Sequence, residues 1–186
     1  MAVNLAKHYF TVSEYERMGE SGIFAPEARV ELIEGEIVEM SPIGSRHAAC
    51  VRLLARTITK LVGDNGIVST QSPVRLNDFS EPQPDVAILR FREDFYSDAH
   101  PEPSDVFLII EVADTTIQYD RHVKMPLYAS AGIAEALIFN LPDDQLEVYW
   151  QPEGGVYQKK AVLKRGEQFS SAAVTGLLLN VEIIPG

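Results

Sequence analysis

The segment DVFLIIEVAD (residues 105–114) restricts the fold of this chain more than any other feature. It is apolar at nearly every interior position, so a strand formed here is apolar on both faces. A strand of that kind belongs in the middle of a sheet that is covered on both sides. The segment therefore predicts a layered α/β or α+β architecture.

Other extended runs predict the remaining strands. The runs at 67–76 and 84–89 are separated from the central segment by loops rich in Pro, Ser and Asp. The segment 135–150 predicts two strands around a Pro-Asp-Asp turn, and short strands and turns are expected from Val156 onward.

The run RVELIEGEIVEM predicts a β-hairpin near the N-terminus. Gly35 supplies the positive φ that a two-residue turn requires, which sets Ile33 opposite Glu36 and Glu31 opposite Val38. In this register Glu31 and Glu36 project from the same face, because side chains alternate along a strand. Two carboxylates are therefore expected on one surface of the hairpin.

Two short helices are also predicted. Thr11 stands three residues before Glu14, which is a capping-box spacing, and indicates a helix over 11–22. A second short helix is expected over 121–132, with Asp120 as its candidate cap and a glycine at its end.

A longer helix is expected between the hairpin and the central strands. Ser45 can cap it, and it ends near Gly63. Its apolar positions recur every three to four residues, at Val51, Leu54, Ile58 and Leu61. Its basic residues are Arg46, Arg52, Arg56 and Lys60. These are possible DNA-phosphate contacts, although a solvated charged face is the commoner meaning of such a stripe.

Composition limits the class of protein. A chain of 186 residues fits one domain, 1–186, with a full hydrophobic core. The net charge of -11 opposes a whole-surface attraction to nucleic acid or anionic membrane, so any contact with a polyanion must be local. Cys50 is the single cysteine, which excludes an internal disulfide. With no apolar run long enough to span a membrane and no signal-peptide core, a cytoplasmic location is expected.

Two acidic residues occur in apolar runs that are expected to form buried strands. Asp85 follows Pro84 at the head of the apolar run PDVAIL, and Glu111 is the charged residue within VFLIIEVA. An unpartnered buried carboxylate costs several kcal/mol, so such an acid is paired, metal-bound or solvated at the end of its strand. Magnesium offers one resolution, since this cation commonly uses only one or two protein acids.

The order and spacing of these pieces resemble the PD-(D/E)XK nuclease superfamily, and more closely the Uma-type family of restriction endonucleases. The matching pieces are ELIEGEIVEMSP, the helix from Arg46, QPDVAIL, LIIEVAD, and Lys124 ahead of LYASAGIAEALIFN. The resemblance implies a restriction-endonuclease-like core, in which helices flank a mixed central β-sheet with a metal site at its edge. An N-terminal helix and hairpin and a C-terminal β extension would complete the domain.

The resemblance also implies which residues form this metal site. Asp85 would be the motif aspartate and Glu111 the motif acid, and together they would hold Mg²⁺ or a substituting Mn²⁺, with the Val112 carbonyl as a further ligand. The superfamily lysine normally stands two residues after the acid, but Ala113 occupies that position here. The Uma-type pattern places a lysine on the next helix instead, and Lys124 matches it. An ordinary surface lysine is the alternative.

Other polar residues have open roles. Glu31 matches the early glutamate of the family and would complete a second metal position or help take a proton, and Glu36 on the same face is the alternative. His47 and His122 could orient a water or a phosphate. Tyr128 shares the helical face of Lys124, and a packing tyrosine is its alternative.

These expectations combine into a Mg²⁺-dependent endonuclease that hydrolyses DNA by a metal-activated water. A homodimer is expected, because cutting both strands of a two-fold-symmetric duplex suits a two-fold protein. The alternative from another class is a catalytically inactive DNA-binding or protein-interaction module, which the net charge and the missing strand lysine favour. A two-carboxylate glycosidase ranks last, because the chain has few aromatic residues to line a sugar cleft.

Overall fold

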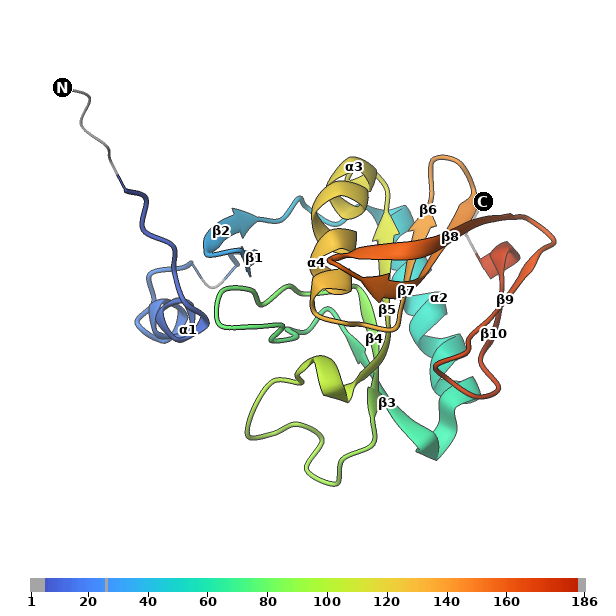
Figure 1. Cartoon of the computed structure of the whole chain (residues 1–186), viewed down its shortest axis with the longest axis horizontal. Helices are drawn as coiled ribbons and strands as arrows, with labels where there is room; N and C mark the ends of the chain where they lie inside the picture. The colour runs from blue at the N-terminus through green and yellow to red at the C-terminus, as the bar shows by residue number, and fades with distance from the viewer. Residues whose placement is uncertain (1–5, 26, 184–186) are drawn as a thin grey trace.

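The centre of the molecule is a six-stranded mixed sheet (Figure 1). The computed structural model describes residues 6–25 and 27–183. In spatial order the strands are β3 (Gly66–Thr70), β4 (Val86–Arg90), β5 (Val106–Ala113), β6 (Glu135–Asn140), β7 (Gln145–Glu153) and β8 (Val156–Lys164). β5 and β6 run parallel, and the other neighbours are antiparallel. The apolar segment forms β5, inside the sheet as its pattern predicts.

Both faces of this sheet are covered. On one face pack α2 (Ser45–Val62) and the antiparallel pair β9 (Gln168–Ser170) and β10 (Leu178–Asn180). The other face carries the helical connection from β5 to β6, which Figure 1 shows as α3 and α4 on the opposite side of the strands from α2. Short 3₁₀ turns cover Gly63–Asn65, Pro103–Asp105 and Val181–Ile183. Each face of β5 therefore has its own hydrophobic core.

Alternation along β5 decides which face each side chain enters. Ile110 and Val112 belong to the core beneath α2, whereas Ile109 and Ala113 belong to the core beneath the helical connection. Glu111 lies between Ile110 and Val112 and therefore projects with Ile109 and Ala113. This alternation places the acid under the helical connection.

The long helix differs from its prediction in two details. Ser45 is its first residue rather than its cap, and Gly44 holds the cap position without a side-chain hydrogen bond. The buried positions are Cys50, Val51, Leu54, Ile58 and Val62. Leu61 is 41% exposed, because the helix presents Val62 to the sheet one turn after Ile58.

The connection from β5 to β6 is one continuous helical segment with an unusual middle. It consists of α3 (Ile117–Tyr119), a π-helical turn at Asp120–Lys124, and α4 (Met125–Ser130). Asp120 is inside this segment, so its prediction as a helix cap is wrong. Pro126 is the second residue after the π-turn. A proline has no N–H to donate and crowds the preceding turn.

The N-terminal elements match their predictions closely. α1 (Val12–Glu20) begins with the expected capping box. The hairpin of β1 (Val30–Ile33) and β2 (Glu36–Glu39) has the predicted register, with Glu31 opposite Val38. The run at 67–76, in contrast, is a strand only as far as Thr70. Within the described ranges the helices are all too short or too polar to span a bilayer.

Candidate functional site

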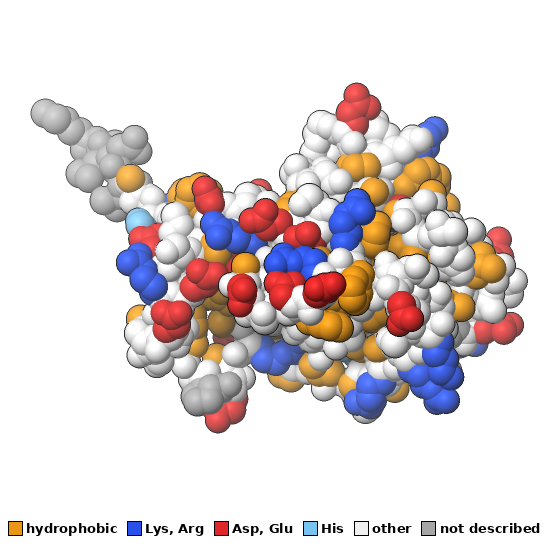
Figure 2. Space-filling model, turned by 90° about the horizontal axis from the view of Figure 1, so that it is seen from below, with side chains coloured by type: hydrophobic (Ala, Val, Ile, Leu, Met, Phe, Trp, Pro, Cys, Tyr) orange, Lys and Arg blue, Asp and Glu red, His pale blue; other side chains and the backbone are white. Residues whose placement is uncertain are grey.

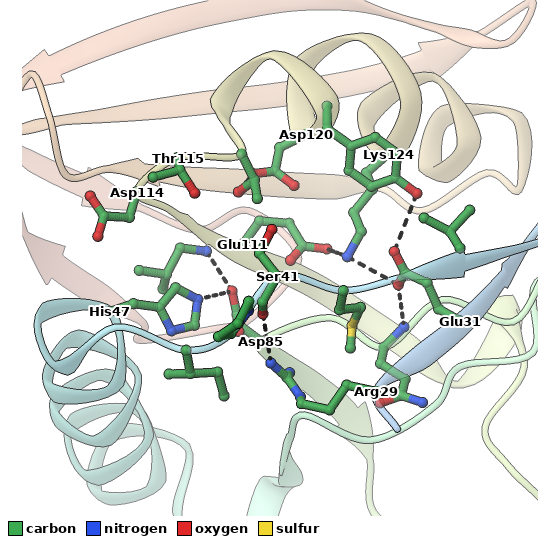
Figure 3. Close-up of a pocket in the computed structure, with 18 of the residues that line it drawn as sticks. Arg29, Glu31, Ser41, His47, Asp85, Glu111, Asp114, Thr115, Asp120 and Lys124 are labelled. Atoms are coloured by element: carbon green, nitrogen blue, oxygen red, sulfur yellow. Dashed lines mark hydrogen bonds and ion pairs between the residues drawn. The ribbon is translucent and has the colours of Figure 1, made fainter. Parts of the chain in front are cut away.

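A cleft of about 560 Å³ opens where β4 begins and β5 ends. Its walls come from β1 and the loop after β2, the start of α2, and the helical connection that carries Asp120 (Figure 3). The structure brings six of the residues singled out from sequence into this cleft: Glu31, His47, Asp85, Glu111, Val112 and Lys124. They come from five segments that are distant in the chain.

Strand pairing brings Asp85 and Glu111 together. Asp85 immediately precedes β4, and the antiparallel pairing of Val86 with Ile110 places Asp85 opposite Glu111. The Val112 backbone N–H donates a hydrogen bond to Asp85 Oδ2 at 2.9 Å. Asp85 just before β4 and Glu111 within β5 therefore lie side by side and share one cleft.

Lys124 reaches this cleft from the π-turn. Its Nζ lies 3.2 Å from Glu111 Oε1 and 3.3 Å from Glu31 Oε2. The residue is 5% exposed, so it is not a solvent-facing lysine. Figure 3 shows its side chain descending from the helix between the two glutamates. A helical lysine therefore lies beside Glu111 although the strand position holds Ala113.

Glu111 lies in an environment that resists its ionisation. The residue is 3% exposed, and burial raises its pKa to about 8 even though Lys124 and Tyr128 act to lower it. The Tyr128 hydroxyl donates a hydrogen bond to Glu111 Oε1 at 2.5 Å. Burial would lower the pKa of Lys124, but the carboxylates of Glu111, Glu31 and Asp120 raise it above its ordinary value. The ammonium is therefore held in its charged form between acids.

Asp85 has a separate set of partners. His47, from the first turn of α2, has its Nε2 3.0 Å from Asp85 Oδ2. The Gln71 amide donates to Asp85 Oδ1 at 3.4 Å. His47 therefore orients the aspartate rather than facing solvent at a helix end.

Some of the cleft residues were missed by sequence reasoning. Asp120 is 4% exposed and faces the cleft, and burial raises its pKa to about 6. The Tyr119 hydroxyl donates to Glu31 Oε1 at 3.3 Å, and the Gln83 N–H donates to Glu31 Oε2 at 3.1 Å. The sequence spacing could have indicated that Asp120 belongs to the site, because it precedes Lys124 by four residues and so shares its helical face.

A second buried acid lies outside the cleft. Glu147 in β7 is 1% exposed, and both of its oxygens accept hydrogen bonds from Arg121 Nε, at 3.0 and 3.1 Å. Lys160 Nζ donates to Oε2 at 2.8 Å, and the Tyr149 hydroxyl donates to it at 2.5 Å. Burial acts to raise the pKa of Glu147, but these donors hold it at about 2. The sequence signal was the same as for Glu111, an acid inside the apolar run LEVYW.

Several predicted residues do not enter the cleft. Glu36 shares a face with Glu31 in the hairpin but is exposed, and its carboxylate pairs with Lys7 at 3.4 Å. His122 is exposed and hydrogen-bonds with Gln118. Of Glu31 and Glu36, only Glu31 lines the cleft and stays a candidate for the site.

The predicted basic stripe also lies elsewhere. Arg52, Arg56 and Lys60 are exposed on α2 and do not line the cleft, while Arg46 pairs with Asp144 at 2.8 Å. Figure 2 shows acidic side chains over much of one face and basic ones in smaller groups. DNA contact through this stripe stays a prediction.

The donor set fits a hard cation better than zinc. In residues 6–25 and 27–183, no three His, Cys, Asp or Glu side chains converge closely enough to hold a metal. Zinc usually requires three or four such ligands, whereas Mg²⁺ is commonly bound by one or two carboxylates together with water and substrate oxygens. Asp85 and Glu111 supply that pair.

Comparison with known proteins places this geometry in context. The Uma2 family model, described as "Putative restriction endonuclease", matches residues 12–182. The crystal structure of a putative nuclease belonging to DUF820 from Anabaena variabilis ATCC 29413 superposes with a TM-score of 0.72 at 14% identity, over 94% of this chain and 97% of that chain. At this identity the likeness shows the fold alone, and it confirms the expected nuclease-like fold. No protein of curated function matches the chain in sequence.

Proposed function

Because the chain belongs to the Uma2 family of putative restriction endonucleases, we propose that it is a Mg²⁺-dependent endonuclease acting on DNA. Mn²⁺ would substitute for Mg²⁺. The observation that carries the proposal is the buried Lys124 ammonium, 3.2 Å from Glu111 in a cleft that also contains Asp85. A cation beside two acids matches the needs of phosphodiester hydrolysis, in which negative charge develops on the phosphate.

Asp85 and Glu111 would hold the metal. Bound there, Mg²⁺ supplies an activated water and neutralises charge on the phosphate. The N–H and C=O of one strand residue point to the same side, so the Val112 carbonyl points toward Asp85 as the Val112 N–H does. The carbonyl would serve as a further ligand. His47 would keep the Asp85 carboxylate oriented, as it does without metal.

Lys124 and Glu31 would act on the substrate. The Lys124 ammonium would stabilise the phosphate or orient the attacking water. Glu31 would then help take a proton or complete a second metal position. Its contacts with Tyr119 and Gln83 hold its side chain toward the cleft.

A DNA substrate suggests the oligomeric state of the protein and the residues that contact the phosphates. Double-strand cleavage favours a homodimer, and the exposed Arg52, Arg56 and Lys60 of α2 are the proposed contacts for DNA phosphates. The net charge of -11 limits such contacts to this local stripe. Light scattering with and without DNA would measure the assembly.

The test is a plasmid-nicking assay with Mg²⁺, Mn²⁺ or EDTA. We expect metal-dependent nicking by wild type and none above background by Asp85→Asn, which keeps the side-chain shape and removes the charge. Glu36→Gln is the matched control for Glu31→Gln, since both change one glutamate of the same hairpin and only Glu31 lines the cleft. A folded wild type that never nicks DNA would favour the non-catalytic binding module.

A further inference from the structure

Glu111 and Glu147 lie in one row across three strands. Glu111 of β5 pairs with Ile138 of β6, and Ile138 pairs with Glu147 of β7. Paired residues project to the same side of a sheet, so both acids face the helical connection. Two strand spacings separate them by about 10 Å.

The same π-turn supplies a cation to each acid. Arg121 contacts Glu147 and Lys124 contacts Glu111, so the turn crosses β6 with one ion pair on either side. The two cations are three residues apart in the same π-turn. The π-turn is therefore attached to the sheet at two points.

These two points differ in rigidity. Arg121 binds both oxygens of Glu147 with its planar guanidinium, and the acid is fixed further by Tyr149 of its own strand. The Lys124 ammonium has contacts of 3.2 and 3.3 Å that it shares between two carboxylates. An ammonium on a four-carbon stem has no fixed direction of its own. The Arg121 attachment is therefore the rigid one.

We propose that Arg121 and Glu147 are positioning residues that fix the π-turn over β6 and thereby direct Lys124 at Glu111. For its effect on rate this inference rests on the proposed nuclease function, but the position of Lys124 can be measured without any activity. A displacement of about 1 Å in a reacting group can cost about 100-fold in rate. Loss of the anchor would therefore reduce turnover without removing a group that touches substrate.

The chain contains a matched control for this idea. Lys160 also donates to Glu147, but it comes from β8 rather than from the π-turn. Arg121→Gln and Lys160→Gln each remove one cation from the same acid. Only Arg121→Gln releases the turn that carries Lys124, so the pair separates positioning from loss of charge near Glu147.

The experiment measures the acetylation rate of the Lys124 amine by acetic anhydride, with peptide mass spectrometry, alongside kcat and KM for plasmid nicking. We expect Arg121→Gln to raise the labelling of Lys124 about tenfold and to lower kcat about tenfold with little change in KM. Lys160→Gln should change neither labelling nor kcat, and Arg121→Lys should restore part of kcat. If Arg121→Gln unfolds, the isosteric Glu147→Gln replaces it.

The outcomes separate this inference from the proposed function. Equal Lys124 labelling in wild type and the folded anchor variant would overturn the positioning role, whether or not the protein nicks DNA. Equal effects of Arg121→Gln and Lys160→Gln would overturn it too. Raised labelling in Arg121→Gln alone, with no nicking by wild type, would support the anchor and reject the nuclease proposal.

Discussion

Glu111 and Glu147 have similarly small exposed fractions on the same face of one sheet, yet their pKa values are displaced in opposite directions. Burial raises the pKa of Glu111 to about 8, whereas hydrogen bonds to charged donors hold the pKa of Glu147 at about 2. Both acids meet a cation from the same π-turn. Neither the exposed fraction of the side chain nor a nearby cation alone therefore accounts for the difference.

The deeper burial of Glu111, the number of donors and the surrounding charge explain it. Glu147 accepts hydrogen bonds from Arg121, Lys160 and Tyr149, so its negative charge is well compensated. Glu111 shares its cation with Glu31 and has other acids around it. A buried acid with enough donors holds structure, whereas one short of donors beside a cleft is prepared to bind a cation.

The largest expected effect is on stability. Glu147→Ala should lower the free energy of unfolding by about 3 kcal/mol, because the buried Tyr149 hydroxyl and the partly exposed cations of Arg121 and Lys160 all lose their acceptor. Glu111→Gln should change it by less than about 1 kcal/mol, because the amide keeps the shape of a carboxyl whose neutral form is already favoured by burial. Urea unfolding in EDTA buffer at pH 7 measures both. Equal losses of unfolding free energy in the two variants would contradict the structural role assigned to Glu147 alone.

The next effect is on rate. Lys124→Ala should reduce nicking about 100-fold, or about 2.7 kcal/mol, because the ammonium acts on charge that appears in the transition state. Its effect on the Mg²⁺ dissociation constant should stay within about threefold, since Asp85 and Glu111 are the proposed metal ligands. Nicking rates and titration calorimetry on the same preparations separate the two. Equal nicking by both proteins would remove Lys124 from the mechanism.

The smallest effect is a pH dependence of opposite sign for the two acids. The pKa of Glu147 is depressed, so its stabilisation is complete above pH 4.5 and is lost as the pH falls toward 2. The pKa of Glu111 is raised, so its stabilisation is complete below pH 4.5 and is lost as the pH rises toward 8.

The measurement is urea unfolding of wild type, Glu147→Gln and Glu111→Gln across pH 3 to 8 without metal. The stability advantage of wild type over Glu147→Gln should shrink in acid. Its advantage over Glu111→Gln should shrink toward alkaline pH. If both stability differences changed with pH in the same direction, the environments of Glu111 and Glu147 would not differ as described.

Much of the fold could be predicted because its signals are local. The apolar run of β5, the capping box at Thr11 and the glycine turn at Gly35 each depend on neighbouring residues. The π-turn was not predictable in this way. Asp120 looks like a helix cap in sequence, and only packing against the sheet turns it inward.

The site could be predicted in part for a similar reason. Asp85 and Glu111 stand out as acids in apolar runs, and the family resemblance adds Glu31 and Lys124. Glu147 is also an acid in an apolar run, and no feature of the neighbouring sequence distinguishes it from Glu111. The distinction depends on donors from other elements, which a single sequence does not show.

Titration calorimetry with Mg²⁺ tests the central claim most directly, using wild type, Glu111→Gln and Glu147→Gln in one buffer at pH 7.5. We predict saturable binding by wild type, at least about tenfold weaker binding by Glu111→Gln, and binding within about threefold of wild type by Glu147→Gln. That result would make Glu111 the acid that binds the cation and Glu147 the acid that holds the fold. No binding by wild type, or unchanged binding by Glu111→Gln, would contradict the account.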